Sequence, residues 1–187
     1  MTRRLIIGMS GASGVIYGVR LLEFLAEAGV ETHLVATKSA LVTLAHETDL
    51  KWAEVKKKAA HVHANDDVTA SIASGSFRTD GMIIAPCSMK SLGEIASGAA
   101  QMLLSRAADV VLKERRRLVL VPRETPLHLG HLRNMAAVTE MGAIVAPPVP
   151  AFYTRPQSID EIVNHGVGRI LDLFDIDVGV VKRWGES

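Results

Sequence analysis

Short apolar runs alternate with helical patterns along most of the chain. The first unit is the clearest: residues 5–9 are apolar, residues 10–14 are rich in glycine and serine, and residues 15–28 carry apolar side chains at helical spacing. Parallel strands need a crossover connection, usually a helix, whereas antiparallel strands can be joined by a short turn. The alternation therefore predicts a doubly wound α/β fold, with a mostly parallel sheet and helices on both faces.

The same pattern continues towards the C-terminus. Further strands are expected over residues 31–36, 81–85, 117–121 and 143–146. Further helices are expected over residues 39–47, 89–97, 101–115 and 129–141, and from a capping Ser158 to residue 174. Between them, residues 51–60 permit a helix, and residues 66–79 indicate a surface loop with a short helical turn. With 187 residues, one domain over residues 1–187 accounts for all these elements.

The charges of the chain nearly cancel, since 21 Lys and Arg oppose 20 Asp and Glu and leave +1. A net charge this small gives the protein no strong overall electrostatic attraction to nucleic acid or to an anionic membrane. We therefore expect neither as a partner. No apolar run approaches the roughly 20 residues that span a bilayer, and residues 10–14 interrupt the first run too early for a signal peptide. We therefore expect a cytoplasmic protein.

Apolar residues are frequent for a soluble chain of this size. They make up 48% of the sequence, and the mean hydropathy is +0.22. This excess indicates that some apolar surface is buried between subunits, so we expect a homo-oligomer.

The cysteine and histidine pattern indicates neither a disulfide nor a metal site. Cys87 is the only cysteine, and no histidine and carboxylate lie near it in the sequence to activate it, so we expect a buried thiol. His61 and His63 form one spaced pair, and His128 and His131 another, but neither pair has an obvious third ligand. The sequence therefore predicts no metal, with these histidines solvated or hydrogen-bonded.

Four polar segments directly follow predicted strands: residues 10–14, 37–39, 86–91 and 123–126. A doubly wound sheet brings such segments to one edge, where its ligands bind. Glycines in the first segment let backbone amides approach an anion beside a helix N-terminus. Its spacing matches neither the dinucleotide nor the Walker A pattern, and no acidic residue follows the second strand to hold a ribose. A phosphate-bearing mononucleotide fits this pattern better.

Side chains in these segments are candidate ligand groups. Hydroxyls that can bond phosphate or ribityl oxygens belong to Ser10, Thr37, Ser39 and Ser88. Ordinary turn and capping roles remain the alternative for each of them. Arg123 and Glu124 follow a buried strand, where an unpaired charge is costly, so we interpret both as site residues. For Tyr153 and Arg169, the pattern by itself favours surface or packing roles.

Longer blocks are more specific than the glycine-rich loop. They are residues 10–14 (SGASG), 86–90 (PCSMK), 107–116 (AADVVLKERR), 121–127 (VPRETPL), 150–153 (PAFY) and 156–158 (PQS). In these blocks, and through residues 183–185 (RWG), the chain resembles the UbiX-like flavin prenyltransferase family. Some members of that family are named small subunits of aromatic or phenolic acid decarboxylases.

The resemblance implies a flavodoxin-like fold and a metal-independent transferase. Such an enzyme joins a dimethylallyl group from dimethylallyl monophosphate to N5 and C6 of reduced FMN. The prenylated FMN would then serve a UbiD-like decarboxylase. By the same resemblance, the homo-oligomer would be a dodecamer.

Site residues can be carried over from the family by position. Those that would hold FMN are Gly11, Ala12, Ser13, Thr37, Ser88, Met89, Lys90, Ser91 and Arg123. Those that would surround the prenyl phosphate are Lys113, Glu124, Tyr153 and Arg169, with Glu47 contributing. The expected catalytic residues are Ser13, Lys113, Glu124, Tyr153 and Arg169, and several of the site residues would meet across a subunit interface. Thr37 departs from the serine of many relatives but keeps the hydroxyl.

The chemistry of the transfer agrees with these residue types. When phosphate leaves an allylic carbon, the site must stabilise the departing anion close to an electron-rich flavin. Lys113 and Arg169 can stabilise the anion, and Tyr153 can donate a hydrogen bond. Glu124 or the released phosphate can move protons.

Two other functions stay open. An FMN-dependent decarboxylase of the cysteine-peptide type would need a histidine on the helix after the second strand, where the nearest candidate, His46, lies late. A noncatalytic FMN-carrying subunit of an aromatic acid decarboxylase would tolerate changes in the prenyl-phosphate residues. The sequence retains all four of those residues, which favours the enzyme.

Overall fold

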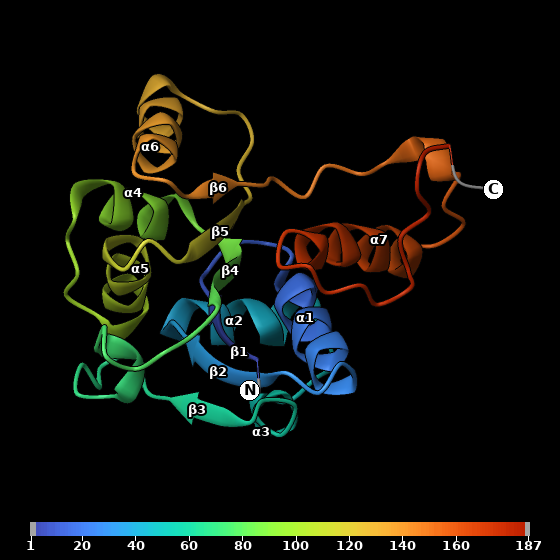
Figure 1. Cartoon of the computed structure of the whole chain (residues 1–187). Coiled ribbons are helices and arrows are strands. Elements are labelled where there is room, and N and C mark those ends of the chain that lie inside the picture. The colour runs from blue at the N-terminus through green and yellow to red at the C-terminus, as the bar shows by residue number, and fades with distance from the viewer. Residues whose placement is uncertain (1–2, 186–187) are drawn as a thin grey trace.

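The computed structural model describes residues 3–185, within which a parallel sheet forms the centre of the molecule (Figure 1). Its strands are β1 (Arg4–Met9), β2 (Glu31–Ala36), β3 (His61–His63), β4 (Gly81–Cys87), β5 (Arg117–Pro122) and β6 (Ile144–Val145). They lie in the order β3-β2-β1-β4-β5-β6, and every adjacent pair is parallel. Apart from the short edge strand β3, this is the flavodoxin-like order. The predicted fold class is confirmed.

Helices cover both faces of the sheet, as predicted. They are α1 (Val15–Glu27), α2 (Lys38–Glu47), α3 (Trp52–Lys56), α4 (Met89–Ser97), α5 (Leu103–Lys113), α6 (Leu129–Glu140) and α7 (Ile159–Asp172). Figure 1 shows α1 and α7 on one side of the sheet and α4 and α5 on the other. Among the described residues, no helix combines the length and the apolar character needed to cross a membrane.

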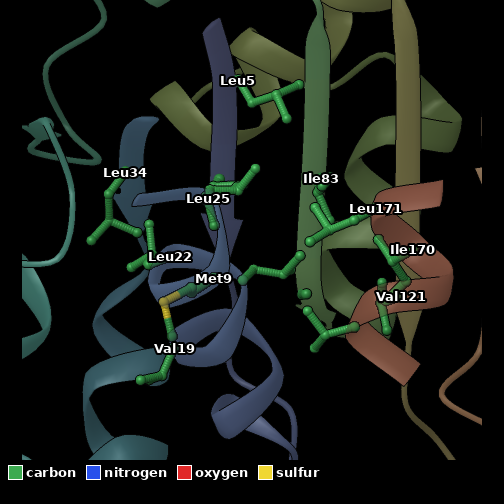
Figure 2. Close-up of a cluster of buried hydrophobic side chains, with 14 of the residues drawn as sticks. Leu5, Met9, Val19, Leu22, Leu25, Leu34, Ile83, Val121, Ile170 and Leu171 are labelled. Atoms are coloured by element: carbon green, nitrogen blue, oxygen red, sulfur yellow. The ribbon is translucent and has the colours of Figure 1, made fainter. Parts of the chain in front are cut away.

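Two apolar cores result from the alternation of side chains along the strands. In β1, Leu5 and Ile7 pack with α1 and α7, while Ile6 packs with α4 and α5 on the opposite face. Figure 2 shows the first core, in which side chains of β1, β4 and β5 meet those of α1 and α7. The central strand β4 is buried along its whole length, which explains its continuous apolar run.

Residues 51–80 contain the main difference from the predicted elements. The helix expected over residues 51–60 is shorter (α3), and the edge strand β3 was not predicted. Two of the three β3 residues are exposed histidine and valine, so the strand lacks the apolar alternation by which strands are recognised. The short helical turn expected in residues 66–79 is present as the 3-10 turn η1 (Ser71–Ala73).

The segment after β6 runs away from the body of the molecule before it reaches the 3-10 turn η2 (Phe152–Thr154) and α7 (Figure 1). Large apolar side chains on this extension and near it are open to solvent in the single chain. The exposed fractions are 78% for Val149, 72% for Phe152, 79% for Ile159 and 82% for Trp184. A surface of this kind is typical of a contact between protein chains.

Candidate active site

The loop of residues 10–14 joins β1 to α1 at the carboxyl edge of the sheet. Ser10 is fully buried: its hydroxyl donates to the Pro86 carbonyl at 3.0 Å and accepts from the Ser88 amide at 2.7 Å. The hydroxyl is therefore committed to joining this loop to the one after β4. The expectation that Ser10 bonds a ligand phosphate is therefore not supported. Ser10 has the alternative role, that of an ordinary turn residue.

Glu47, the last residue of α2, places its carboxylate at the N-terminus of α1. One of its carboxylate oxygens accepts from the amides of Gly14 at 2.9 Å and Val15 at 3.1 Å. A negative charge there is favoured by the positive end of the helix dipole. Within residues 3–185, no hydrogen bond engages the amides of Gly11 and Ser13, so these two remain able to donate to an anion.

The hydroxyls of Thr37 and Ser88 cap helices. Thr37 accepts from the Ala40 amide at 3.1 Å at the start of α2, and Ser88 accepts from the Ser91 amide at 3.2 Å at the start of α4. Each of them also contacts a second hydroxyl. That of Thr37 lies 3.0 Å from the Ser39 hydroxyl, and that of Ser88 lies 3.2 Å from the Ser91 hydroxyl. The capping role therefore applies to both residues and places two pairs of hydroxyls at the carboxyl edge.

A cavity of about 610 Å³ lies between the loops after β2 and β4. It is lined by both hydroxyl pairs, by Lys38 and Lys90, and by the carboxylates Asp66 and Glu94. Small-molecule and cofactor sites commonly have volumes of about 300–1,000 Å³. The cavity therefore offers hydroxyl groups in a space of the right size for a mononucleotide, while its two lysines are balanced by two carboxylates, and Lys90 lies 3.7 Å from Glu94.

Arg123 and Glu124 follow β5 at the same edge. The Arg123 amide donates to the Cys87 carbonyl at 3.3 Å, which joins this loop to the end of β4. Both side chains are exposed, and a Glu124 carboxylate oxygen accepts from the next amide, that of Thr125, at 3.0 Å. The argument from a buried unpaired charge was wrong, because the chain turns outward as soon as the buried strand ends. Their position at the edge agrees with the prediction.

Tyr153 and Arg169 line a second cavity, of about 540 Å³, together with Tyr17 and the proline-containing segment after β6. The Tyr153 hydroxyl donates to the Lys182 carbonyl at 3.1 Å. The Arg169 guanidinium donates to Asp172 at 2.7 Å, and Asp172 also pairs with Arg183 at 2.9 Å. Hydrogen bonds from Arg183 and Arg169 hold the pKa of Asp172 below its ordinary value. Asp172 therefore stays ionised and orients Arg169.

His165 is a residue of this second cavity that the sequence analysis did not single out. Its side chain is largely buried, and its ring meets that of Tyr153 edge-on at 6.0 Å. Among the described residues, its Nε2 atom has no hydrogen-bond partner. Its position four residues before Arg169 on α7, hence on the same helix face, is the signal that could have identified it.

Lys113 lies apart from the other predicted site residues. It is the last residue of α5, just before the start of β5, and therefore lies at the amino edge of the sheet. Its ammonium group pairs with Glu114 at 2.5 Å, and it lines another cavity, of about 600 Å³, beside Asp109. One chain alone does not bring Lys113 to the carboxyl edge.

Met89 and Cys87 contribute to packing at the end of β4. Met89 is half-buried against the core formed with α4 and α5. Cys87 is fully buried, and this burial raises the pKa of its thiol to about 12. A buried thiol was predicted, and this environment disfavours the reactive thiolate.

The Cys87 environment predicts that a thiol reagent leaves the native protein unlabelled at neutral pH, because the thiolate is scarce and inaccessible. Intact mass after treatment with iodoacetamide measures this. The control is the same reaction in guanidinium chloride, where one label per chain is expected. Rapid stoichiometric labelling of the native protein would contradict a buried, structural thiol.

Comparisons with known proteins show which family and fold this chain shares. The family model described as Flavoprotein matches residues 1–181. The flavin prenyltransferase UbiX of Thauera aromatica is 58% identical over 181 residues, which cover 97% of this chain and 93% of the relative. A crystal structure of AnUbiX (PadA1) with FMN and dimethylallyl pyrophosphate is 51% identical, with a TM-score of 0.98 and complete coverage of both chains. A dodecameric FMN-dependent UbiX-like decarboxylase from Escherichia coli O157:H7 is also 51% identical, with a TM-score of 0.96 over 98% of this chain and 100% of the other.

Proposed function

This chain belongs to the UbiX-like flavin prenyltransferases, and we propose on that basis that it joins a dimethylallyl group from dimethylallyl monophosphate to N5 and C6 of reduced FMN. One observation supports this most directly: the loop of residues 10–14 lies between the two cavities. A Cβ atom on Gly11 would meet Ser39 of the first cavity at 2.4 Å, and one on Gly14 would meet Tyr17 of the second at 3.4 Å. The geometry therefore suits a flavin beside a second, smaller substrate.

The residues around the first cavity fit FMN. The amides of Gly11 and Ser13 are able to donate to its phosphate, and Lys90 supplies a positive charge nearby. The further expected ligands are Ala12, Thr37, Ser88, Met89, Ser91 and Arg123. Reduced FMN supplies the electron-rich N5 and C6 atoms of the reaction.

The residues around the second cavity fit the phosphate of the prenyl donor. Arg169 stabilises the negative charge that grows on the departing phosphate, and Tyr153 donates a hydrogen bond to it. Glu124 moves a proton at the flavin, and Glu47 keeps the loop of residues 10–14 in place through its bonds to two amides. Ser13 adds an exposed hydroxyl between the two substrates.

The complete site requires more than one chain in this proposal. Lys113 lies at the amino edge of its own sheet and is supplied to the site by a neighbouring copy. The exposed apolar residues after β6 and the dodecameric relative support a large homo-oligomer. The product passes to a UbiD-like decarboxylase in the cytoplasm, and the transfer itself requires no metal ion.

The proposal is tested by incubating the purified protein anaerobically with reduced FMN and dimethylallyl monophosphate in the presence of a chelator. Extracted flavin is then analysed by mass spectrometry. We expect a gain of one five-carbon prenyl unit. The diphosphate is compared as donor, because the similar AnUbiX structure contains dimethylallyl pyrophosphate. Unmodified FMN with both donors, despite tight binding, would favour a carrier subunit or a decarboxylase of cysteine-derived or aromatic acids.

A further inference from the structure

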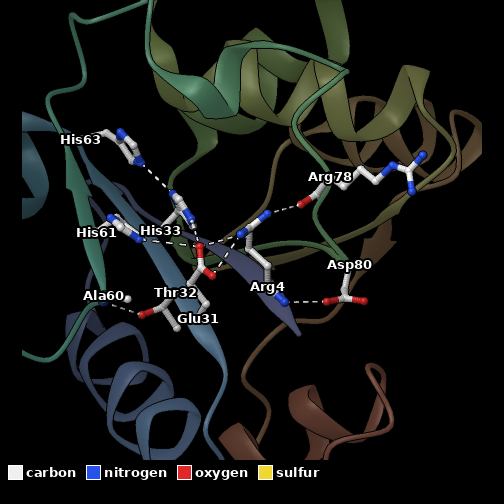
Figure 3. A network of polar contacts seen from close by, with 9 residues as sticks. All are labelled: Arg4, Glu31, Thr32, His33, Ala60, His61, His63, Arg78 and Asp80. Atoms are coloured by element: carbon white, nitrogen blue, oxygen red, sulfur yellow. Dashed lines mark hydrogen bonds and ion pairs between the residues drawn. The ribbon is translucent and has the colours of Figure 1, made fainter. Parts of the chain in front are cut away.

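Three histidines and a glutamate meet at the amino edge of the sheet, opposite the candidate active site (Figure 3). Glu31 is the first residue of β2, and His61 is the first residue of β3. His33 is paired with His61 across the two strands, and side chains two residues apart on a strand share a face. Glu31, His33, His61 and His63 therefore project from the same face of the β2–β3 pair.

Three ligand atoms lie close enough together to surround one ion. The Glu31 carboxylate oxygen lies 2.9 Å from Nε2 of His33 and 3.6 Å from Nε2 of His61. All three ligand atoms lie within 4.8 Å of one another. Ligands at about 2.1 Å from a tetrahedral ion are separated by about 3.4 Å. Only a small adjustment is needed, and it falls to the half-exposed His61, whose ring stacks on that of His33 with the centroids 4.6 Å apart.

Hydrogen bonds with His63 and Arg4, which are not among the three ligands, orient the side chains of His33 and Glu31. Nδ1 of His33 lies 2.9 Å from Nε2 of His63, so the ring nitrogen that faces away from Glu31 is hydrogen-bonded. The Arg4 guanidinium donates to both oxygens of Glu31, at 2.6 and 3.0 Å (Figure 3). Metal-binding histidines and carboxylates commonly have such outer partners, which orient the ligand atoms.

We propose that Glu31, His33 and His61 bind one divalent transition-metal ion, of the Zn²⁺ or Ni²⁺ class, that fastens the edge strand β3 to β2. Two imidazoles favour these metals over Mg²⁺ and Ca²⁺, which prefer sets of oxygen ligands. The Arg4 charge opposes that of Glu31 and further disfavours a purely electrostatic cation site. Within one chain the cluster lies at the opposite edge from the candidate active site, so we assign the ion no part in prenyl transfer.

The experiment measures Zn²⁺ binding to the full-length protein without an affinity tag. The protein is treated with a chelator, dialysed against a series of free Zn²⁺ concentrations and analysed for bound zinc. We expect saturation at one ion per chain and at least about 10-fold weaker binding in His61→Gln. The matched control is His46→Gln, which changes an exposed histidine on α2 and is expected to bind as the native chain does. Mg²⁺ is expected not to bind in the same assay.

A stability measurement gives a second readout. Zn²⁺ at about 100 times its Kd should raise the Tm of the native chain by roughly 5–10 °C, and the same Zn²⁺ concentration should raise the Tm of His61→Gln by no more than about half as much. No saturable binding would overturn the proposal and leave a hydrogen-bonded network. Unchanged binding in His61→Gln, with loss in His131→Gln, would also overturn it and assign the ion to the His128–His131 pair. Prenyl transfer is measured separately without metal, so failure of either proposal leaves the other testable.

Discussion

Arg169→Ala is expected to lower the rate of prenyl transfer by about 100- to 1,000-fold while FMN remains bound. Arg169 contributes a cation to the cavity that we assign to the prenyl phosphate, and Asp172 orients its guanidinium at 2.7 Å. Loss of that cation removes stabilisation that matters most when phosphate departs. The measurement is a single-turnover reaction with reduced FMN bound, in which prenylated flavin is counted by mass at successive times.

Arg133→Ala is the matched control for this prediction. Arg133 is an exposed arginine on α6 and lies outside the cavity that contains Arg169, so its removal should leave the rate unchanged. Glu124→Ala should resemble Arg169→Ala if Glu124 moves a proton, with FMN still bound. Normal turnover in both Arg169→Ala and Glu124→Ala would disprove these assignments, and loss of FMN from Arg169→Ala would place the residue at the flavin instead.

The central part of the fold could be predicted from the sequence because buried strands and helix faces consist mostly of apolar residues. β1 and β4 are covered on both faces, so their residues are almost all apolar, and the helix after β1 carries its buried residues at helical spacing. The edge strand β3 has no such apolar pattern. Its hydrogen bonds with β2 are backbone contacts, which its three residues do not reveal.

The site was predictable to the extent that it depends on strand ends. The polar segments after β1, β2, β4 and β5 do meet at one edge, because parallel strands share a direction. Which hydroxyls face a ligand could not be predicted, since Ser10 and Ser88 have equivalent positions in the sequence but only the first is fully buried. The separation of Lys113 from that edge depends on where α5 ends, and a site shared between chains leaves no local pattern.

The histidines show the same limit. His61 and His63 looked like a pair without a third ligand, because Glu31 and His33 lie about 30 residues earlier. Parallel pairing of β2 with β3 brings the four side chains to one face. Ligands contributed by two strands at alternate positions therefore become visible only once the register is known.

Gly11→Ala is expected to weaken FMN binding by about 10- to 100-fold, or about 1.4–2.7 kcal/mol, which is of the size that overpacking commonly costs. A Cβ atom on Gly11 would lie 2.4 Å from both Cβ and Oγ of Ser39 and 3.2 Å from its backbone carbon. Rotation of the Ser39 side chain cannot move its Cβ, so the loop of residues 10–14 or the first turn of α2 must shift. That shift displaces the free amides of Gly11 and Ser13, which we assign to the FMN phosphate.

Two further variants separate this clash from a general effect of alanine. In Gly93→Ala the new Cβ would meet only the Asn134 side chain, at an ordinary 3.4 Å, so FMN binding should stay as in the native chain. In Gly11→Ala/Ser39→Gly the offending side chain is absent, so the affinity should fall less relative to Ser39→Gly than the affinity of Gly11→Ala falls relative to the native chain. Fluorescence titration of FMN measures all the affinities. Native affinity in Gly11→Ala, or an equal loss from Gly11→Ala with and without Ser39→Gly, would show that close contact between the loop and α2 does not position the phosphate-binding amides.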